Sequence, residues 1–246
     1  MNRSSRFIMG RNCIYEVLNS NPDRILKVYT CQKNEDDALY TELQKNKICI
    51  KRVSKGEIAK MVNSESHQSY VASVKEIPNI HIRDFIEESQ NKDQSLVLML
   101  DSIYDPQNLG TIMRAAECFG VDLVIYSKNR GSDITPTVTK TSAGATELVP
   151  IAKVSNLADT MLAFQKADYW AGCADVGKRS KSLYEFEFPE KTLLIMGSEG
   201  EGVRPLLKKK CDFHISIPML GQIDSLNVSQ ATAVLLNSYR SVFSSY

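Results

Sequence analysis

Short apolar runs alternate with amphipathic stretches along the chain, and this alternation predicts strands that alternate with helices. In the first ninety residues we expect helices at about 11–18, 35–46 and 54–62, and strands at 25–31, 48–53 and 70–74. Ser54, followed three positions later by Glu57, has the pattern of a capping box at a helix start. The N-terminal part is therefore predicted to form a small α/β unit with its own apolar pattern.

The stretch 77–94 is polar and rich in acidic residues, and with one short amphipathic helix at 84–89 it is predicted to be a linker. After it the alternation restarts more strongly. We expect strands at 95–100, 121–126, 148–153, 169–174, 192–196 and 213–217, and helices at 108–119, 137–143, 157–166, 203–209 and 228–243. This order indicates βαβ units in a mainly parallel sheet, which binds ligands at the carboxyl ends of its strands. The fold class is predicted to be α/β, in two domains.

The composition narrows the class of protein only slightly. Lys and Arg number 30 against 29 Asp and Glu, so no bulk charge points to a nucleic-acid partner. The longest apolar run, 96–100, is far below the roughly 20 residues of a membrane span, and no signal-peptide core follows the basic N-terminus. We expect a soluble cytoplasmic protein with no membrane partner. The six Cys and three His are scattered, which argues against a zinc site, so no metal is predicted.

Three polar stretches each begin where a predicted strand ends. In the first, Asn108 is a suitable N-cap for the helix after Pro106, and Arg114 lies within its first two turns. From spacing alone, an ion pair of Arg114 with Glu117 at the edge of the core is favoured over a role facing an anion.

The second stretch is a glycine-rich loop between a buried strand and a helix. It carries Gly197, Gly200 and Gly202, with Glu199 and Glu201 between them. It matches neither a dinucleotide fingerprint nor a phosphate-binding P-loop, and its carboxylates would repel a triphosphate. Because a tight turn explains one or two glycines but hardly three, the loop indicates a ligand with neutral or positive groups.

The third stretch has Ser225, Asn227 and Ser229 at the start of the last helix. One capping residue is expected there, so three leave polar groups free for a ligand. The run Lys208–Lys210 is interpreted as a solvated helix end in preference to a phosphate contact. Residues alone thus lead to an α/β enzyme with a glycine-rich ligand loop and a polar site.

Together these stretches resemble the three signature motifs of the SpoU (TrmH-like) branch of the SPOUT RNA methyltransferases. The matching segments are DPQNLGTIMRAAECFGV, IMGSEGEGV and IPMLGQIDSLNVSQA, in the family's order, and TSAGATELVP is similar to its middle region. The resemblance covers about residues 95–243. It implies a C-terminal domain threaded into a trefoil knot, an exception to the usual rule against knots.

The resemblance also implies a cofactor, S-adenosylmethionine, held by the loops of the second and third motifs, and a homodimer with the active site at the subunit interface. The cofactor-binding residues it implies are Gly197, Gly202, Ile217, Met219 and Leu226.

The implied reaction is methyl transfer to a ribose 2′-hydroxyl of RNA. The catalytic residues that the motifs imply are Asn108, Arg114, Glu199, Ser225 and Asn227. The family's arginine has been proposed as the base. A guanidinium is effectively always protonated, so Arg114 could instead stabilise the developing alkoxide and clamp a phosphate.

Residues 1–76 resemble the ribosomal-protein-like RNA-binding domain of the branch that methylates a guanosine in the peptidyl-transferase region of 23S rRNA. The matching segments are MGRNCIYEVL and HQSYVA, with Ser69 where members usually have Gly. His67 fits a packed histidine and a functional group equally well. The predicted domains are 1–76 for RNA binding, 77–94 as linker and 95–246 as methyltransferase. The alternatives are a tRNA ribose methyltransferase, a resistance methyltransferase and a non-catalytic RNA-binding module; a dehydrogenase is weaker, for want of G-x-G-x-x-G.

Overall fold

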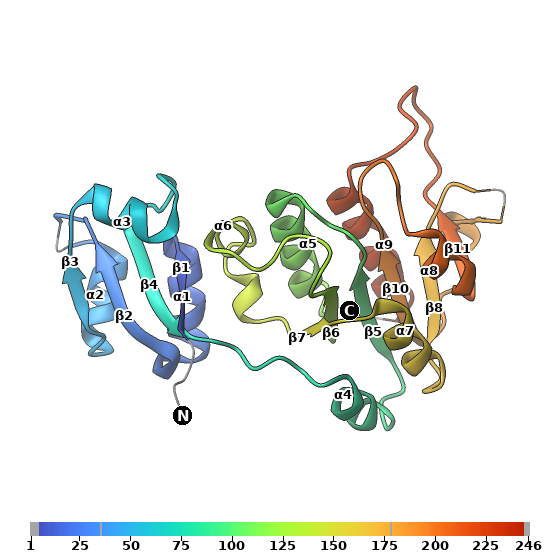
Figure 1. Ribbon diagram of the computed structural model, residues 1–246, viewed down its shortest axis with the longest axis horizontal. Coiled ribbons are helices and arrows are strands. Elements are labelled where there is room, and N and C mark those ends of the chain that lie inside the picture. Colours follow the sequence, from blue (N-terminus) through green and yellow to red (C-terminus); the bar gives the residue numbers. More distant parts are fainter. Residues whose placement is uncertain (1–4, 35, 178, 244–246) are drawn as a thin grey trace. The chain divides into compact units, whose positions relative to one another are not determined.

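The computed structural model describes residues 5–34, 36–177 and 179–243, and the chain forms two compact units (Figure 1). Unit 1 comprises the chain up to Pro78 together with Ile134–Leu148. Unit 2 comprises Asn79–Asp133 and the chain from Val149 onward. Both units are α/β, which confirms the predicted fold class.

Unit 1 is built on a four-stranded mixed sheet in the order β1-β4-β2-β3. Its strands are β1 (Ser5–Met9), β2 (Ile25–Thr30), β3 (Ile50–Arg52) and β4 (Tyr70–Lys75). Strand β4 runs antiparallel to β1 and β2, while β2 and β3 are parallel. The sequence pattern predicted every strand of this sheet except β1.

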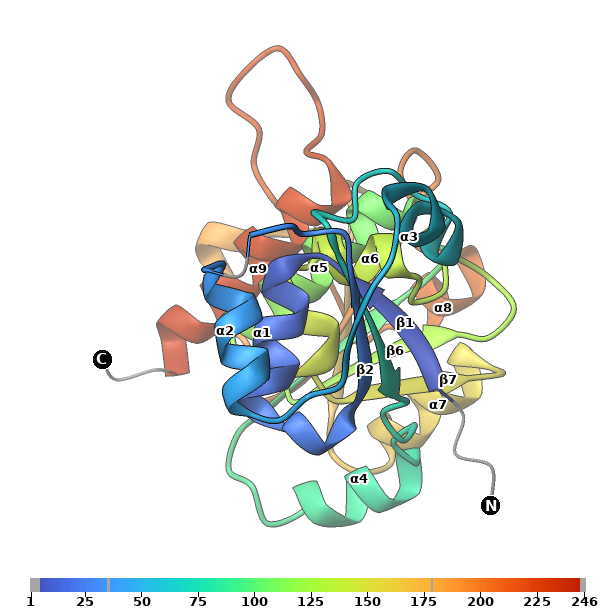
Figure 2. The same cartoon turned by 90° about the vertical axis from the view of Figure 1, so that its left-hand side faces the viewer.

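Helices cover both faces of this sheet because the side chains of each strand alternate between the faces. On one face lie α1 (Arg11–Ser20) and α2 (Ala38–Lys45) (Figure 2). Their buried residues share one apolar core with Ile8 and Tyr70. On the other face α3 (Lys55–Val62) packs on Met9. The predicted capping box of Ser54 and Glu57 begins α3, which confirms that helix start. The predicted start of the preceding helix at residue 35 lies outside the described residues; α2 begins at Ala38.

The segment Ile134–Leu148 follows β6 in the chain but packs within unit 1. It contains α6 (Pro136–Thr141), which contacts β1, and a short 3-10 helix (Ala145–Glu147), which contacts α1. The carboxylate of Glu147 is fully buried and accepts hydrogen bonds from Arg6 (2.5 Å) and Arg24 (2.8 Å). The predicted methyltransferase domain, 95–246, includes this segment, whereas in the structure the segment belongs to unit 1.

The turn before β4 contains Ser69 at φ +67°, in the left-handed region that favours glycine. This geometry gives the physical reason why glycine suits the position. Ser69→Gly should raise the free energy of unfolding by about 1 kcal/mol, since a left-handed conformation costs a non-glycine residue about that much. Urea unfolding measures the change. Asn63→Gly is the matched control, because Asn63 is also left-handed (φ +49°) but tolerates it better; an equal gain in both variants would contradict the account.

Asp37 joins α2 to the rest of unit 1. Its carboxylate accepts hydrogen bonds from the Arg11 guanidinium (2.5 and 3.0 Å), from the Tyr70 hydroxyl (2.8 Å) and from the backbone of Tyr40 (3.1 Å). Burial raises the pKa of Asp37, but these hydrogen bonds outweigh it and lower the pKa to about 2, against an ordinary value of 3.8.

This lowered pKa predicts a loss of stability in acid. Because the pKa of Asp37 is lower in the folded than in the unfolded chain, its ionised carboxylate stabilises the fold at pH values above the unfolded pKa. This stabilisation is lost as the pH falls toward 2. It amounts to about 2 kcal/mol near neutral pH. Asp37→Asn should therefore narrow the difference in unfolding free energy between about pH 6 and about pH 3. Chemical unfolding at both pH values measures it, and an unchanged difference would contradict the assignment.

Unit 2 is built on a seven-stranded parallel sheet in the order β7-β6-β5-β10-β8-β11-β9. The strands are β5 (Ser95–Leu100), β6 (Leu123–Ser127), β7 (Ile151–Val154), β8 (Trp170–Ala174), β9 (Lys181–Ser182), β10 (Lys191–Met196) and β11 (Phe213–Ser216). The parallel sheet confirms the prediction, which missed only the two-residue β9. The trefoil knot stays a prediction.

Helix α5 (Pro106–Cys118) lies beside α9 (Val228–Phe243) (Figure 1). The helices α7 (Leu157–Gln165) and α8 (Pro205–Lys210) contribute Phe164 and Leu207 to a core packed against the sheet. Helix α4 (Ile82–Ser89) lies within the predicted linker 77–94, yet its Phe85 belongs to this core. Among the described residues, no helix has the length and apolar character needed to cross a membrane.

Candidate active site

Asn227 connects the three sequence motifs. Its Nδ2 donates to Asn108 Oδ1 (3.0 Å) on α5 and to Glu199 Oε1 in the glycine-rich loop. Its Oδ1 accepts from the backbone N–H of Ser229 (2.8 Å) and from the Ser229 hydroxyl (2.6 Å). Because the amide oxygen caps α9, the amide nitrogen must face the other two motifs. Segments separated by up to 119 residues thus meet at one side chain.

Asn108 lies inside α5, and the prediction that it is the N-cap was wrong. The helix begins two residues earlier, at Pro106, and Asp105 is the cap, accepting from the backbone of Gln107. Proline suits the first helical position because it lacks an N–H that would otherwise need a partner. Asn108 is buried, so its amide is available to Asn227 but not to solvent.

The glycine-rich loop closes on itself, and its own geometry explains all three glycines. A Cβ on Gly197 would lie 2.0 Å from the backbone of Gly202. Gly200 and Gly202 have φ of +81° and +68°, which side chains rarely allow. A reciprocal pair of backbone hydrogen bonds between Ser198 and Gly202 completes the turn. The argument that a turn could hardly require three glycines was therefore wrong, although the turn does present Glu199 to Asn227.

Arg114 is exposed, and the predicted ion pair with Glu117 is not formed. Six positions separate it from Asn108, which at 100° per residue turns the two side chains about 120° apart around the helix. Among the described residues, the Arg114 side chain has no hydrogen-bond or ion-pair partner. Its guanidinium is thus free to meet an anion from outside the unit, the alternative that spacing alone disfavoured.

The loop between β11 and α9 carries Ile217, Met219, Ser225 and Leu226. In both views it extends away from the body of unit 2 (Figures 1 and 2). None of the backbone groups from 217 to 226 hydrogen-bonds to another backbone group in the described part of the chain. The Ser225 hydroxyl donates to Asp224 (3.2 Å), so the structure does not bring Ser225 into the Asn227 network.

Sequence reasoning missed a contact that fixes the end of the glycine-rich loop. Asp101, fully buried at the end of β5, accepts from the Arg204 backbone N–H (3.0 Å) and from Arg204 Nε (2.7 Å). The Ser102 hydroxyl also donates to it (3.2 Å). A lone acidic residue directly after a buried strand was the available signal, but its partner lies 103 residues away.

Asp101→Ala should lower the free energy of unfolding by about 2–3 kcal/mol, since it leaves the donors of Arg204 and Ser102 without their charged acceptor. Urea unfolding measures the loss. Asp101→Asn retains one acceptor and should lose less. Equal unfolding free energies for wild type and Asp101→Ala would contradict the role given to this carboxylate.

His67 lies in unit 1 and is buried. Its Nδ1 accepts from the backbone N–H of Ser69 (3.1 Å), and burial lowers its pKa below the ordinary value. Of the two interpretations of His67, the packed histidine of a turn fits this geometry.

Two family models match the chain. The SpoU rRNA methylase family covers residues 95–237, and a model described as RNA 2′-O ribose methyltransferase substrate binding covers residues 7–79. The first model includes the glycine-rich loop, for which methyl transfer is expected from the sequence. The second covers most of the sheet of unit 1, for which RNA binding is expected.

Full-length relatives agree with these matches. The 23S rRNA (guanosine-2′-O-)-methyltransferase RlmB of Pasteurella multocida is 36% identical over 236 residues, which cover 94% of this chain and 96% of that protein. The AdoMet-bound rRNA methyltransferase from Sinorhizobium meliloti covers 98% of this chain and 88% of its own, with a TM-score of 0.78 at 21% identity, a likeness of fold. A TrmH/SpoU tRNA modifying enzyme from A. aeolicus, 26% identical, covers 65% of this chain and 83% of its own, with a TM-score of 0.55. The chain, with its three motifs joined at Asn227, belongs to the SpoU rRNA methylase family.

Proposed function

We propose that this protein transfers a methyl group from S-adenosylmethionine to the ribose 2′-hydroxyl of a guanosine in 23S rRNA. The observation that carries the proposal is the Asn227 network, which joins the three motifs in one polar site. The match to a 23S rRNA guanosine methyltransferase over 94% of the chain supports the substrate.

The residues present fit the cofactor. The loop from 217 to 226 offers backbone donors and acceptors that have no backbone partner, and these suit the edges of an adenine. Beside them Ile217, Met219 and Leu226 give apolar contacts, while Gly197 and Gly202 hold the neighbouring turn. When bound, S-adenosylmethionine supplies an electrophilic methyl group on sulfur. These five residues are proposed to hold it.

Each proposed catalytic residue then has a role set by its position. Asn108 and Glu199 fix the amide of Asn227, which would orient the ribose. The Ser225 hydroxyl donates to Asp224 outside this network, and it is proposed to act on the ribose from the loop between β11 and α9. In-line attack requires the oxygen to be held in one geometry, which is where such fixed groups act. Because a guanidinium is a poor base, Arg114 would stabilise the developing alkoxide and an adjacent phosphate, while the hydroxyl proton would pass to a phosphate oxygen or to water.

The protein is proposed to act as a homodimer with the site at the subunit interface. Two observations support this. Arg114 points about 120° away from Asn108 around α5, and the exposed loop beside the site carries apolar Leu220 (93% exposed) and Ile223 (76% exposed). Mixing Arg114→Ala subunits with Gly197→Ala subunits should restore methyl transfer if one site uses residues of both copies. No restoration in mixed dimers would contradict a shared site.

Unit 1 favours rRNA over tRNA. The tRNA modifying enzyme from A. aeolicus covers 65% of this chain, whereas the 23S rRNA enzyme covers 94%. The match of residues 7–79 to a substrate-binding model makes RNA binding the proposed role of this part. An rRNA substrate would place the protein in the cytoplasm.

The test is transfer of labelled methyl groups from S-adenosylmethionine to unmodified 23S rRNA and, separately, to unmodified tRNA. Label in rRNA alone is the expected result. Label in tRNA alone would keep the chemistry and overturn the substrate. A chain that binds no S-adenosylmethionine would overturn the enzyme and leave a non-catalytic RNA-binding module.

A further inference from the structure

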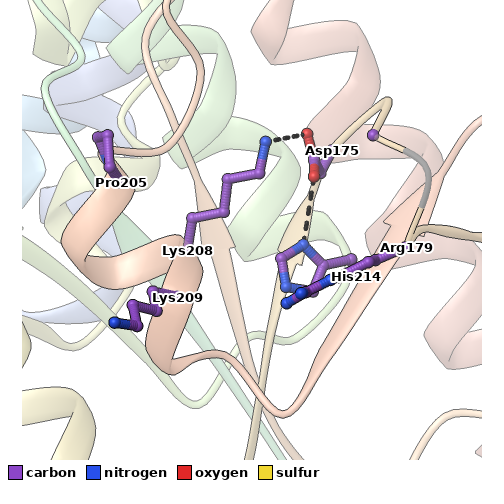
Figure 3. A pocket seen from close by; sticks show the side chains of 7 residues that line it. Asp175, Arg179, Pro205, Lys208, Lys209 and His214 are labelled. Carbon is purple, nitrogen blue, oxygen red and sulfur yellow. Dashed lines mark hydrogen bonds and ion pairs between the residues drawn. The ribbon is translucent and has the colours of Figure 1, made fainter.

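Unit 2 has a second polar site, apart from the Asn227 network. A pocket of about 440 Å³ opens between the end of β8, α8 and β11 (Figure 3). It is lined by Asp175, Gly177, Arg179, Pro205, Lys208, Lys209 and His214. We call it the basic pocket, because the side chains of Arg179, Lys208 and Lys209 line it against the single carboxylate of Asp175.

The one carboxylate is already neutralised by its neighbours. Asp175 Oδ1 accepts from Lys208 Nζ (2.6 Å), and its Oδ2 is 3.2 Å from His214 Nδ1. Burial raises the pKa of Asp175, but these contacts outweigh it and keep the pKa below its ordinary value. A Cβ on Gly177 would lie 2.9 Å from the same carboxylate, so glycine allows the loop to close over it.

The positive charge that remains is available to a ligand. Within the described part of the chain, neither Arg179 nor Lys209 forms an ion pair. Both side chains are exposed, and both line the basic pocket. Lys208 and His214 already hold the carboxylate, so the pocket presents the unpaired cations of Arg179 and Lys209. This arrangement favours an anionic ligand.

The lining favours phosphate groups without an attached base. Apart from the ring of His214, no aromatic or large apolar side chain among the described residues lines the pocket. A nucleobase would find no stacking surface there, whereas phosphate oxygens need only cationic donors.

The basic pocket lies beside the candidate cofactor loops. Strands β8 and β10 are adjacent, and Cys173 pairs with Ile195 near their carboxyl ends. Asp175 and Gly197 are the first residues after these two neighbouring strands. Pro205, which lines the pocket, follows the glycine-rich loop directly. An RNA whose ribose reached the Asn227 network could therefore extend its backbone to this pocket.

We propose that the basic pocket binds a backbone phosphate of the RNA substrate and so positions the RNA on unit 2. The inference rests on the proposed function, which supplies RNA as the substrate. Contacts of this kind carry no sequence information but set register and affinity.

The test compares Lys209→Glu with Lys166→Glu, which makes the same charge change at the opposite, amino end of β8. RNA binding is measured by fluorescence anisotropy with a fragment of 23S rRNA over a salt series. Lys209→Glu should weaken binding about tenfold at low salt and reduce the slope of log K against log salt by about 1. Arg179→Ala should weaken it in the same direction, and Lys166→Glu should stay within about twofold of wild type.

Three results would overturn the inference. One is an unchanged RNA affinity in Lys209→Glu and Arg179→Ala. Another is that these two variants lose affinity for S-adenosylmethionine, measured by calorimetry, while their RNA affinity stays intact; this result would assign the pocket to the cofactor. The third is binding of inorganic triphosphate that depends on Lys209 while RNA binding does not, which would assign it to a small polyphosphate. Methyl transfer by the wild-type protein is measured in parallel. If no methyl transfer occurs while RNA binding depends on Lys209, the proposed function is contradicted and the phosphate site is supported.

Discussion

Arg114→Ala should lower the rate of methyl transfer by about 10²–10³-fold or more, the usual effect of removing a group that stabilises developing negative charge. The side chain is exposed and has no hydrogen-bond or ion-pair partner among the described residues, so its removal breaks no polar contact of the fold. The affinity for S-adenosylmethionine should stay within about threefold of wild type, because other loops are proposed to hold the cofactor.

Single-turnover transfer to 23S rRNA measures the rate, and calorimetry measures cofactor affinity. Glu117→Ala is the matched control, since Glu117 lies one turn further along α5 and is also exposed. Arg114→Lys should recover only part of the rate, because lysine keeps the charge but lacks the planar fork. A folded Arg114→Ala variant that no longer binds S-adenosylmethionine would contradict the role given to Arg114.

Gly197→Ala should weaken S-adenosylmethionine binding by about 100-fold, because the added methyl group forces the glycine-rich loop apart at a cost of about 1–3 kcal/mol. The methyl carbon would lie 2.0 Å from Gly202 and 2.1 Å from Val203, both backbone atoms that cannot turn away. Displacement of the loop also carries Glu199 away from Asn227.

Gly221→Ala is the control for this variant. Gly221 lies in the other proposed cofactor loop, where an added Cβ would meet nothing within 4 Å. Calorimetry should find its S-adenosylmethionine affinity close to that of wild type. If Gly197→Ala binds the cofactor as tightly as Gly221→Ala does, the closed turn is not part of the cofactor site.

Local patterns predicted most of the elements. Strand β5 and helix α9 have the predicted bounds, and the capping box at Ser54 begins α3 as expected. These features depend on hydrophobic periodicity and on side chains within one turn, both readable from neighbouring residues. Strand β1 was missed because its five residues begin with Ser and Arg, and its pairing with β4 lies far along the chain.

Long-range contacts explain what the sequence alone did not yield. The burial of Glu147 between Arg6 and Arg24 joins residues more than 120 positions apart, and no local pattern announces it. Asp105 could have been identified as the cap of α5, because an acidic residue before proline is a helix-start signal. At the site, the motifs predicted Asn108, Glu199 and Asn227 together, but not that Ser225 would turn to Asp224.

The central claim is ribose methylation of one guanosine in 23S rRNA, and nucleoside analysis of the methylated product tests it most directly. Unmodified 23S rRNA is incubated with the wild-type protein and S-adenosylmethionine, digested to nucleosides and examined by mass spectrometry, with reverse transcription locating the modified position. The account predicts 2′-O-methylguanosine at a single position in the peptidyl-transferase region. A methyl group on a base, or on the ribose of a different nucleotide, would contradict it.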